Sequence, residues 1–112
     1  MATYSYAATA TTNAILVAGR PSALTGWSIV NTSAATRYVR IYNKSAVPVP
    51  ATDAALIALR LPLATGQRSD VQVGANAEWL SAGLAFDITG AAADTDATAV
   101  TAGDVTVAFF YV

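Results

Sequence analysis

The chain has 112 residues, of which 54% are hydrophobic and only 12% are charged, and its formal net charge is −1. It contains no histidine and no cysteine, which excludes disulfides, thiolate nucleophiles, zinc sites with nitrogen or sulfur ligands and the usual general base near neutral pH. So few positive charges also exclude the basic patch that nucleic-acid binding requires. We therefore expect one domain over residues 1–112, with no catalytic residues, no metal, no cofactor and no nucleic-acid partner.

Membrane association is not expected either. The aliphatic run at residues 14–18 is far shorter than the roughly 18 apolar residues of a membrane-spanning helix, and no basic segment of a signal peptide precedes it. Much of the hydrophobic fraction is alanine, and a surface of small residues with little charge is poor at keeping a protein monomeric. This composition favours a protein that packs against neighbours.

Turn residues divide the chain into short runs rich in β-branched and aromatic side chains. About eight short strands at this spacing predict an all-β domain, either an antiparallel β-sandwich or a jelly-roll-like barrel. The expected strands are residues 4–9, 13–18, 24–31, 37–42, 56–61, 71–79, 82–88 and 105–111.

One of these strands has a competing interpretation. Residues 51–59 include helix-forming residues behind a possible N-cap at Thr52 or Asp53, and Pro62 would stop such a helix. Residues 57–61 also alternate between apolar and polar positions, which favours a short helical turn followed by a strand.

The segment RYVRIYNK at residues 37–44 alternates between two faces and ends in a turn signal. Val39 and Ile41 share one face, which we expect in the core, whereas Tyr38, Arg40 and Tyr42 share the other. Tyrosine and arginine are enriched at protein interfaces, so this second face suits a partner protein. The alternative is a solvated strand in which the arginine stem lies across the two rings. We expect Arg40→Ala to leave folding nearly intact but to weaken assembly.

The last expected strand is apolar on both faces. Val105 begins one face and Thr106 the other, and the segment ends in Phe109, Phe110, Tyr111 and Val112. Such a strand is typical of burial on both sides. We expect Phe110, Tyr111 and Val112 to lie in the core or at a contact between subunits.

Few residues suggest a ligand site. Asp94 and Asp96 are the only closely spaced carboxylates, but the glycine turn and bidentate glutamate of a calcium loop are missing, so a solvated loop is favoured. Trp27 follows the alternation of its strand and is expected in the core. Trp79 lies near the end of an expected strand and is expected at a rim, where it could serve as a platform for a ligand.

Three segments together resemble small β-sandwich structural proteins of tailed bacteriophages. They are GWSIVNTSAATRYVRIYNK at 26–44 with Pro48, Pro50 and ATD at 51–53 behind it, GLAFDITG at 83–90, and AADTD at 92–96. The resemblance covers roughly residues 24–110 and carries no site motif, so it transfers no functional residue. It implies a virion component that is not an enzyme.

Within that family, the composition fits a head decoration (cement) protein on the capsid surface. Such a protein stabilises the head by burying surface against the major capsid protein or other virion proteins. The low charge and the apolar C-terminal segment predict a homo-oligomer, and the resemblance favours a trimer because decoration proteins often occupy threefold positions. The alternative is a tail, neck or fibre component that binds a receptor or carbohydrate through a platform of Trp79 and the tyrosine residues.

Overall fold

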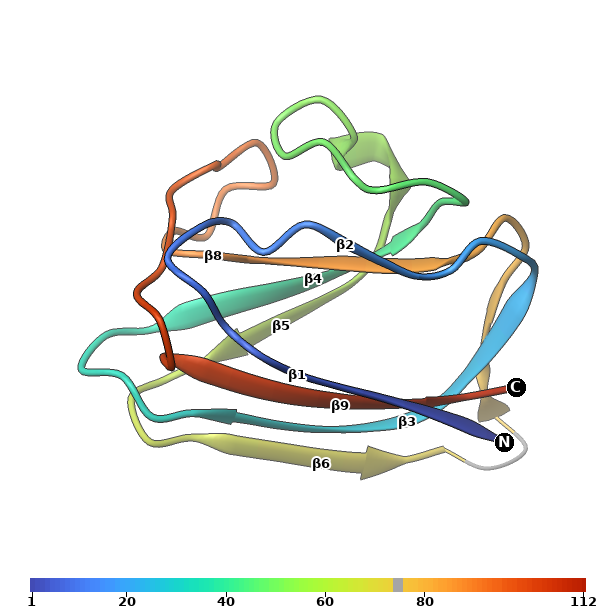
Figure 1. The fold of residues 1–112 in the computed structure, drawn as a ribbon, viewed down its shortest axis with the longest axis horizontal. Helices are drawn as coiled ribbons and strands as arrows, with labels where there is room; N and C mark the ends of the chain where they lie inside the picture. The colour runs from blue at the N-terminus through green and yellow to red at the C-terminus, as the bar shows by residue number, and fades with distance from the viewer. Residues whose placement is uncertain (74–75) are drawn as a thin grey trace.

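The computed structural model describes residues 1–73 and 76–112, and it is a sandwich of two antiparallel β-sheets (Figure 1). The all-β, single-domain sandwich expected from the sequence is thus confirmed, with nine strands and no α-helix in the described ranges. The strands are β1 (Ala2–Ala7), β2 (Ile15–Ala18), β3 (Ser22–Asn31), β4 (Arg37–Asn43), β5 (Ile57–Leu63), β6 (Arg68–Gln72), β7 (Glu78–Leu80), β8 (Leu84–Thr89) and β9 (Val105–Tyr111).

The two sheets draw their strands from the whole length of the chain. Sheet A has the order β1-β9-β3-β6, with the short β7 also paired to β3, and sheet B has the order β2-β8-β4-β5. In Figure 1, sheet A forms the lower layer and sheet B the upper layer. The chain passes repeatedly from one sheet to the other, so most strands pair with segments distant in sequence.

The hydrophobic core fills the space between the two sheets. Phe86 of β8 and Phe109 of β9 lie at its centre, with ring centroids 5.0 Å apart, and both are fully buried. Alternate residues of each central strand point into this space, as the period of two requires. The buried inward-facing residues include Leu24, Trp27 and Ile29 of β3, Val39 and Ile41 of β4, Ile88 of β8, and Val105 and Val107 of β9. The core positions expected for Trp27, Val39 and Ile41 are confirmed.

The expected strands agree with the observed ones except at residues 71–79, two of which lie outside the described residues. That segment is not one strand: β6 ends at Gln72 and β7 begins at Glu78, and the two strands pair with different parts of β3. The apolar alternation that predicted one strand therefore belongs to two separate edge segments.

The competition at residues 51–59 is resolved in favour of a turn and a strand. The 3₁₀ turn η1 (Ala54–Leu56) leads directly into β5, which pairs with β4 from Tyr42 to Arg37. Asp53 precedes the turn without a side-chain cap, so no longer helix is stabilised there. Extended pairing with β4 thus outweighs the helix propensity of these residues.

The expectation that β9 is buried on both sides is wrong for the chain by itself. Phe109 is fully buried, but Phe110 and Tyr111 are only partly buried and Val112 is 60% exposed. One face of β9 packs in the core, and the other belongs to the outer surface of sheet A. No helix in the described ranges is long and apolar enough to cross a membrane.

Substituting Val39 by aspartate should abolish cooperative folding, because this position is 0% exposed and would hold an unpaired charge between the sheets. Val47 is 54% exposed, so Val47→Asp is the matched control and should melt like the wild type. Thermal unfolding followed by circular dichroism gives the comparison. Equal melting temperatures for the two variants would contradict this placement of the core.

Candidate functional site

Arg40 and Tyr42 lie inside the molecule, on the side of sheet B that faces away from the hydrophobic core. Only 2% of Arg40 and none of Tyr42 is exposed. The strand register sets Arg40 between Arg60 of β5 and Asp87 of β8. Asp87 is also fully buried, so a charged pair lies at the middle of this face.

All five N–H donors of the Arg40 guanidinium have acceptors. Nε and Nη2 form a bidentate pair with the Asp87 carboxylate, with 2.8 Å between Nε and Oδ1. The three remaining donors bind the backbone carbonyls of Ala93, Asp94 and Asp96 at 3.2, 2.8 and 2.9 Å. Asp87 also accepts a hydrogen bond of 2.8 Å from the Tyr42 hydroxyl. The buried charges are therefore paired and fully hydrogen-bonded, as burial demands.

The carbonyls that Arg40 binds belong to the loop at residues 90–99, which lies over sheet B. Arg60 adds a second, bidentate contact to the same loop through the side chain of Asp94, at 2.7 Å for both bonds. Asp96 accepts hydrogen bonds from Ala91 and Thr98 and so fixes the shape of the loop. Figure 1 shows this loop and the one at residues 44–56 above sheet B. The chain thus covers this face with its own segments.

Burial and the hydrogen bond to Asp87 both raise the pKa of Tyr42, which therefore stays a neutral hydrogen-bond donor far into the alkaline range. Burial alone would lower the pKa of Arg40, but hydrogen bonding and the charge of Asp87 outweigh it and raise that pKa. The arrangement therefore holds Arg40 as a cation and Tyr42 as a phenol.

Neither Arg40 nor Tyr42 is available to a partner, which corrects the expectation that Tyr38, Arg40 and Tyr42 form an interface. The alternation itself is confirmed, since Val39 and Ile41 point into the core and the other residues point away. The second face of β4 is covered by the loop at residues 90–99, and not by a partner or by solvent. Tyr38 is half-buried and lines a hollow of about 190 Å³ between β4, β5 and this loop.

One feature of the sequence indicates the buried ion pair between Arg40 and Asp87. Asp87 interrupts the apolar run LAFDI at residues 84–88, and a lone carboxylate in a buried strand needs a partner that neutralises it. The expected partner would be one of the few cations, but Arg40 is 47 residues away and only the strand pairing brings the two together. The acidic loop beside it is exposed to solvent at most of its residues, as expected, and hydrogen bonds from Arg40 and Arg60 also hold it over sheet B.

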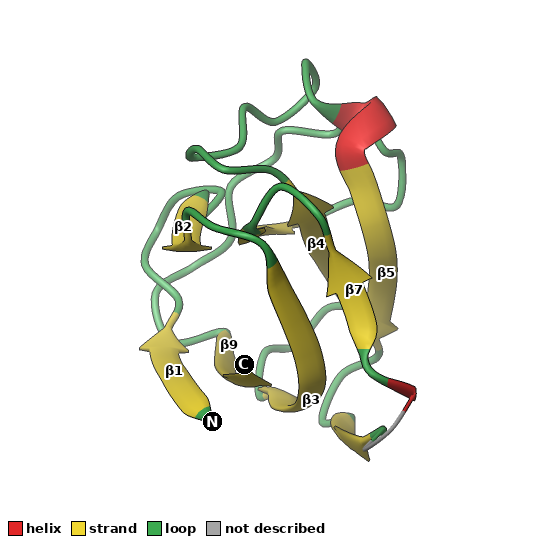
Figure 2. Ribbon diagram, turned by 90° about the vertical axis from the view of Figure 1, so that its right-hand side faces the viewer, coloured by secondary structure: helices red, strands yellow, loops and turns green. Residues whose placement is uncertain are grey.

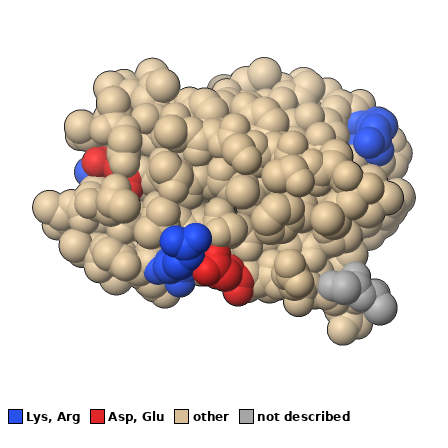
Figure 3. Space-filling view, turned by 60° about the horizontal axis from the view of Figure 1, so that its bottom comes forward, with Lys and Arg blue, Asp and Glu red and all other residues tan. Residues whose placement is uncertain are grey.

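The outer face of sheet A differs from that of sheet B because no segment of the described chain lies over it. Cross-strand rows of small and uncharged residues form most of this face. The rows are Thr3–Phe110–Gly26–Gln72, Ser5–Ala108–Ser28–Asp70 and Ala7–Thr106–Val30–Arg68. Charge enters only at β6, where Arg68 and Asp70 form an exposed ion pair at 2.7 Å. Figure 3 looks toward this side of the molecule and shows a broad surface with charged side chains only near its margins.

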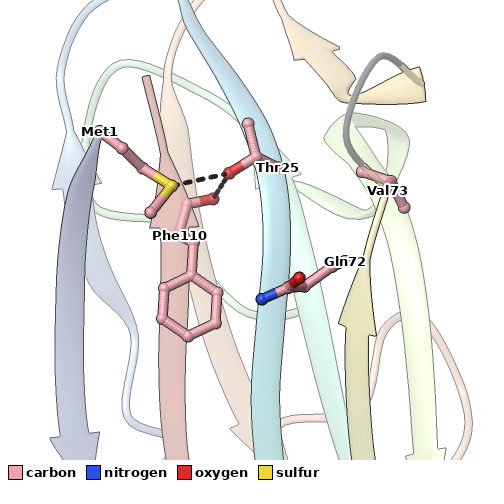
Figure 4. A pocket seen from close by; sticks show the side chains of 5 residues that line it. All are labelled: Met1, Thr25, Gln72, Val73 and Phe110. Atoms are coloured by element: carbon pink, nitrogen blue, oxygen red, sulfur yellow. Dashed lines mark hydrogen bonds between the residues drawn. The ribbon is translucent and has the colours of Figure 1, made fainter.

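Phe110 lies at the centre of the first of these rows. A side chain on Gly26 would clash with the carbonyl oxygen of Val71 and reach to 3.4 Å from the Phe110 ring, so glycine is what lets the strands and the ring approach closely. Figure 4 shows Phe110 beside Met1, Thr25, Gln72 and Val73, which line an open hollow of about 510 Å³. The Thr25 hydroxyl donates to the Phe110 carbonyl at 3.0 Å. Phe110 is thus an expected contact residue that lies on a broad free face.

Trp79 lies on β7 and is 61% exposed, as expected for a rim position. Among the described large hydrophobic residues that are exposed, it is the one aromatic, and it does not line any of the hollows described above. Tyr111 packs against the core with part of its ring, and Val112 is exposed at the end of β9. Ala23 of β3 pairs with Trp79 on one side and with Val112 on the other, so these two exposed residues lie in one cross-strand row, whereas Tyr38 lies in sheet B.

Every aspartate in the chain already accepts hydrogen bonds from the protein, and five of the six form ion pairs. The hydrogen bond from Arg60 lowers the pKa of Asp94, that from Ser28 lowers the pKa of Asp70, and that from Lys44 lowers the pKa of Asp53. A general acid at neutral pH needs a carboxyl whose pKa is raised. The described residues also contain no cluster of three or more potential metal ligands. These carboxylates hold neighbouring segments of the fold together.

Comparison with protein-family models, with curated proteins and with solved structures finds no match to this chain.

Contrary to the expectation from the sequence, substituting Arg40 by alanine should destabilise the fold strongly, by about 3–5 kcal/mol, because Asp87 would remain buried without its cation. Arg60→Ala is the matched control, since its ion pair with Asp94 is 52% and 40% exposed and water can replace the lost contact. The free energy of unfolding in urea measures both. Similar losses for the two variants would show that the buried pair is not the stabilising contact.

Raising the pH above about 10 should lower the free energy of unfolding of the wild type more steeply than that of Tyr42→Phe. Above the ordinary pKa of tyrosine, Tyr42 loses its proton in the unfolded chain but keeps it in the folded one, because its folded pKa is raised. The folded state then binds more protons, so stability falls as pH rises. Urea unfolding between pH 7 and pH 11 tests this, and the four other tyrosines are common to both proteins. Parallel pH curves would contradict the assignment.

Proposed function

We propose that this chain is a structural protein of a tailed-bacteriophage virion, without catalytic activity, and that it decorates the capsid surface and stabilises it by burying protein surface. The observation that carries the proposal is the outer face of sheet A, which is broad, nearly uncharged and not covered by the chain itself. The resemblance of residues 24–110 to virion proteins supplies the kind of partner, namely the major capsid protein or another virion protein.

The size of this face supports the proposal. The whole molecule measures 34 Å along its longest axis and 19 Å along its shortest, which is the viewing direction of Figure 1. A face with this outline covers roughly 650 Å² at most, so its burial would supply a large part of the about 800 Å² that each partner contributes to a standard stable interface. Small serine, threonine and alanine side chains lose little rotational freedom when a partner covers them. Phe110 provides the large aromatic contact that such interfaces need near their centre.

The chemistry of the described residues also supports a role in contact and not in turnover. The aspartates are held in ion pairs and hydrogen bonds, and the sequence has no histidine as a general base and no cysteine as a thiolate nucleophile. A decoration protein requires none of them. It requires a rigid domain, which the paired charges of sheet B help to provide by fixing its loop.

The alternative, a tail, neck or fibre component that binds a receptor or carbohydrate, would need exposed aromatic residues gathered around a cleft. Trp79 is exposed, but the described residues near it in the fold contribute no second exposed aromatic side chain. The geometry therefore favours the capsid surface. In either location the chain is expected to self-associate, and the trimeric number is implied only by the resemblance.

Virions assembled without this chain should form but lose their genome at lower temperature than complete virions, and adding the purified protein should restore heat resistance. Thr106→Glu should restore it much less, because it puts a charge on the exposed face of sheet A, where desolvation on docking is costly. Ala55→Glu, at an exposed position of η1 on the side of sheet B, is the matched control and should act like the wild type. Co-sedimentation with the virions measures binding, and genome release on heating measures stabilisation.

Two results would contradict the proposal. Equal restoration by Thr106→Glu and by the wild type would remove sheet A as the docking face. Virions that keep full heat resistance without the chain but fail to adsorb to cells would replace decoration by receptor binding.

A further inference from the structure

One lateral side of the sandwich is formed by the edges of β1 and β2. β1 ends sheet A and β2 ends sheet B, and Figure 2 shows the two strands one above the other on the same side of the molecule. Residues 1–19, which include both strands, contain no charged side chain. This side therefore joins two free backbone edges to an uncharged surface.

The four strands that end the two sheets differ in how they are protected against pairing with another chain. Edge strands are usually kept apart by charges, by proline, by bulges or by being short. β5 carries Arg60 and Pro62, and β6 carries the Arg68–Asp70 ion pair. β2 has only four residues, and its register with β8 shifts between Leu16 and Ala18.

β1 has none of these protections. Its sequence, ATYSYA, contains neither charge nor proline. All six residues pair with β9 in one continuous register, from Ala2 opposite Tyr111 to Ala7 opposite Thr106. In an antiparallel edge strand, every second residue directs its N–H and C=O groups away from the sheet, where another strand can bind them.

Two tyrosines make the same side apolar. Tyr4 and Tyr6 of β1 pack against the edge of Phe86, with ring centroids 6.1 and 5.8 Å from that of Phe86. Their own rings are stacked at 6.4 Å, and the Tyr6 hydroxyl donates to Asn13 Oδ1 at 2.6 Å. Both tyrosines remain partly exposed, as do Ile15 and Val17 of β2 above them. A surface that covers β1 would thus bury apolar area as well as satisfy the backbone.

We infer that β1 is the edge at which a second copy of this chain pairs, antiparallel to the first and across a twofold axis normal to the sheets. A second copy of the chain fits this edge, because the twofold axis places the same sheet of both copies in the same layer. Sheet A of one copy then continues into sheet A of the other, while the two β2 strands face each other in the layer of sheet B. An uncharged strand is also complementary to itself, since no like charges meet. The proposed function includes self-association, and this inference names the surface through which it occurs, so it rests on the proposed function.

The pleat of the strand restricts how the two copies can align. Inward-facing residues must oppose inward-facing residues, because a shift by one residue would turn every side chain to the wrong face. The register that aligns residues 3–7 with each other puts Ser5 on the twofold axis and Tyr4 opposite Tyr6 of the second copy. Four tyrosine rings then close the side of the sandwich together, in cross-strand pairs that favour aromatic contacts.

This geometry joins copies in pairs. A trimer through the same edge would have to bring β1 against a different strand of the next copy, and the other end of sheet A presents the charged edge of β6. The solution species expected from the structure is therefore a dimer, not the trimer implied by the resemblance.

Sedimentation analysis at tens of micromolar should give twice the mass of the chain for the wild type. Ser5→Lys and Ser5→Glu should each raise the dimer dissociation constant at least about tenfold, because like charges would meet on the axis. Ser5 is exposed, so the fold should be unaffected. An equal mixture of the two variants should restore the dimer, since opposite charges would then meet. Gln72→Lys, an exposed residue at the opposite edge of sheet A, is the matched control and should stay dimeric.

The mixture makes the experiment decisive, because a variant that had merely lost its fold would not regain its partner from another variant. A monomeric wild type, a trimer, or Ser5 variants that stay dimeric would each overturn the inference. Co-sedimentation with virions is measured separately on the same samples. A monomer that still binds virions would end the inference and leave the proposed function standing, whereas a dimer that binds none would do the reverse.

Discussion

The ion pair between Arg40 and Asp87 is the contact on which the upper half of the sandwich depends. Removing both charges from water is costly, and their attraction compensates only if every donor and acceptor finds a partner. Here the guanidinium binds one carboxylate and three carbonyls, and the carboxylate also accepts from Tyr42. These contacts join β4, β8 and the loop at residues 90–99 into one unit. Apolar side chains could fill the same space, but they could not hold three backbone carbonyls of a loop in place. The pair therefore contributes more to defining the position of the loop than a hydrophobic contact would.

That arrangement makes the two faces of the sandwich unequal. Sheet B is covered on its outer side by loops that Arg40, Arg60 and Lys44 fasten through aspartates or carbonyls. Sheet A has no such cover in the described chain, and its outer side consists of small uncharged residues around Phe110. A protein in which loops cover one sheet and the other sheet is exposed is suited to bind a larger surface through the exposed sheet. The uncharged lateral side at β1, where we propose that a second copy pairs, lies at right angles to that face. A domain with two distinct contact surfaces can bind a shell and a neighbour at the same time.

Much of the strand pattern could be predicted from the residues, for physical reasons that differ between segments. The alternation at Val39 and Ile41, and that from Val105 to Phe109, gave the strands and their inward faces because side chains alternate strictly along an extended chain. The segment at residues 71–79 was misassigned because its apolar positions belong to two short strands on different parts of β3. The interface expected at Arg40 and Tyr42 failed for another reason. Tyrosine and arginine mark this strand face as unusual. However, the same residue types occur both in buried ion pairs and in protein interfaces, so the sequence does not distinguish the two.

The sequence by itself determined the class of the protein: an all-β domain without histidine or cysteine, with few charges and with one inward face along each strand. Only the tertiary structure decided what lies against the second face of each sheet. Period-two alternation distinguishes two sides of a strand but carries no information about which distant segment covers them. Asp87 meets Arg40 because β8 pairs with β4, and the loop follows because it begins where β8 ends. β1 is left at an edge because β9, from the other end of the sequence, takes its only paired side. Pairings of this range depend on the packing of the whole domain.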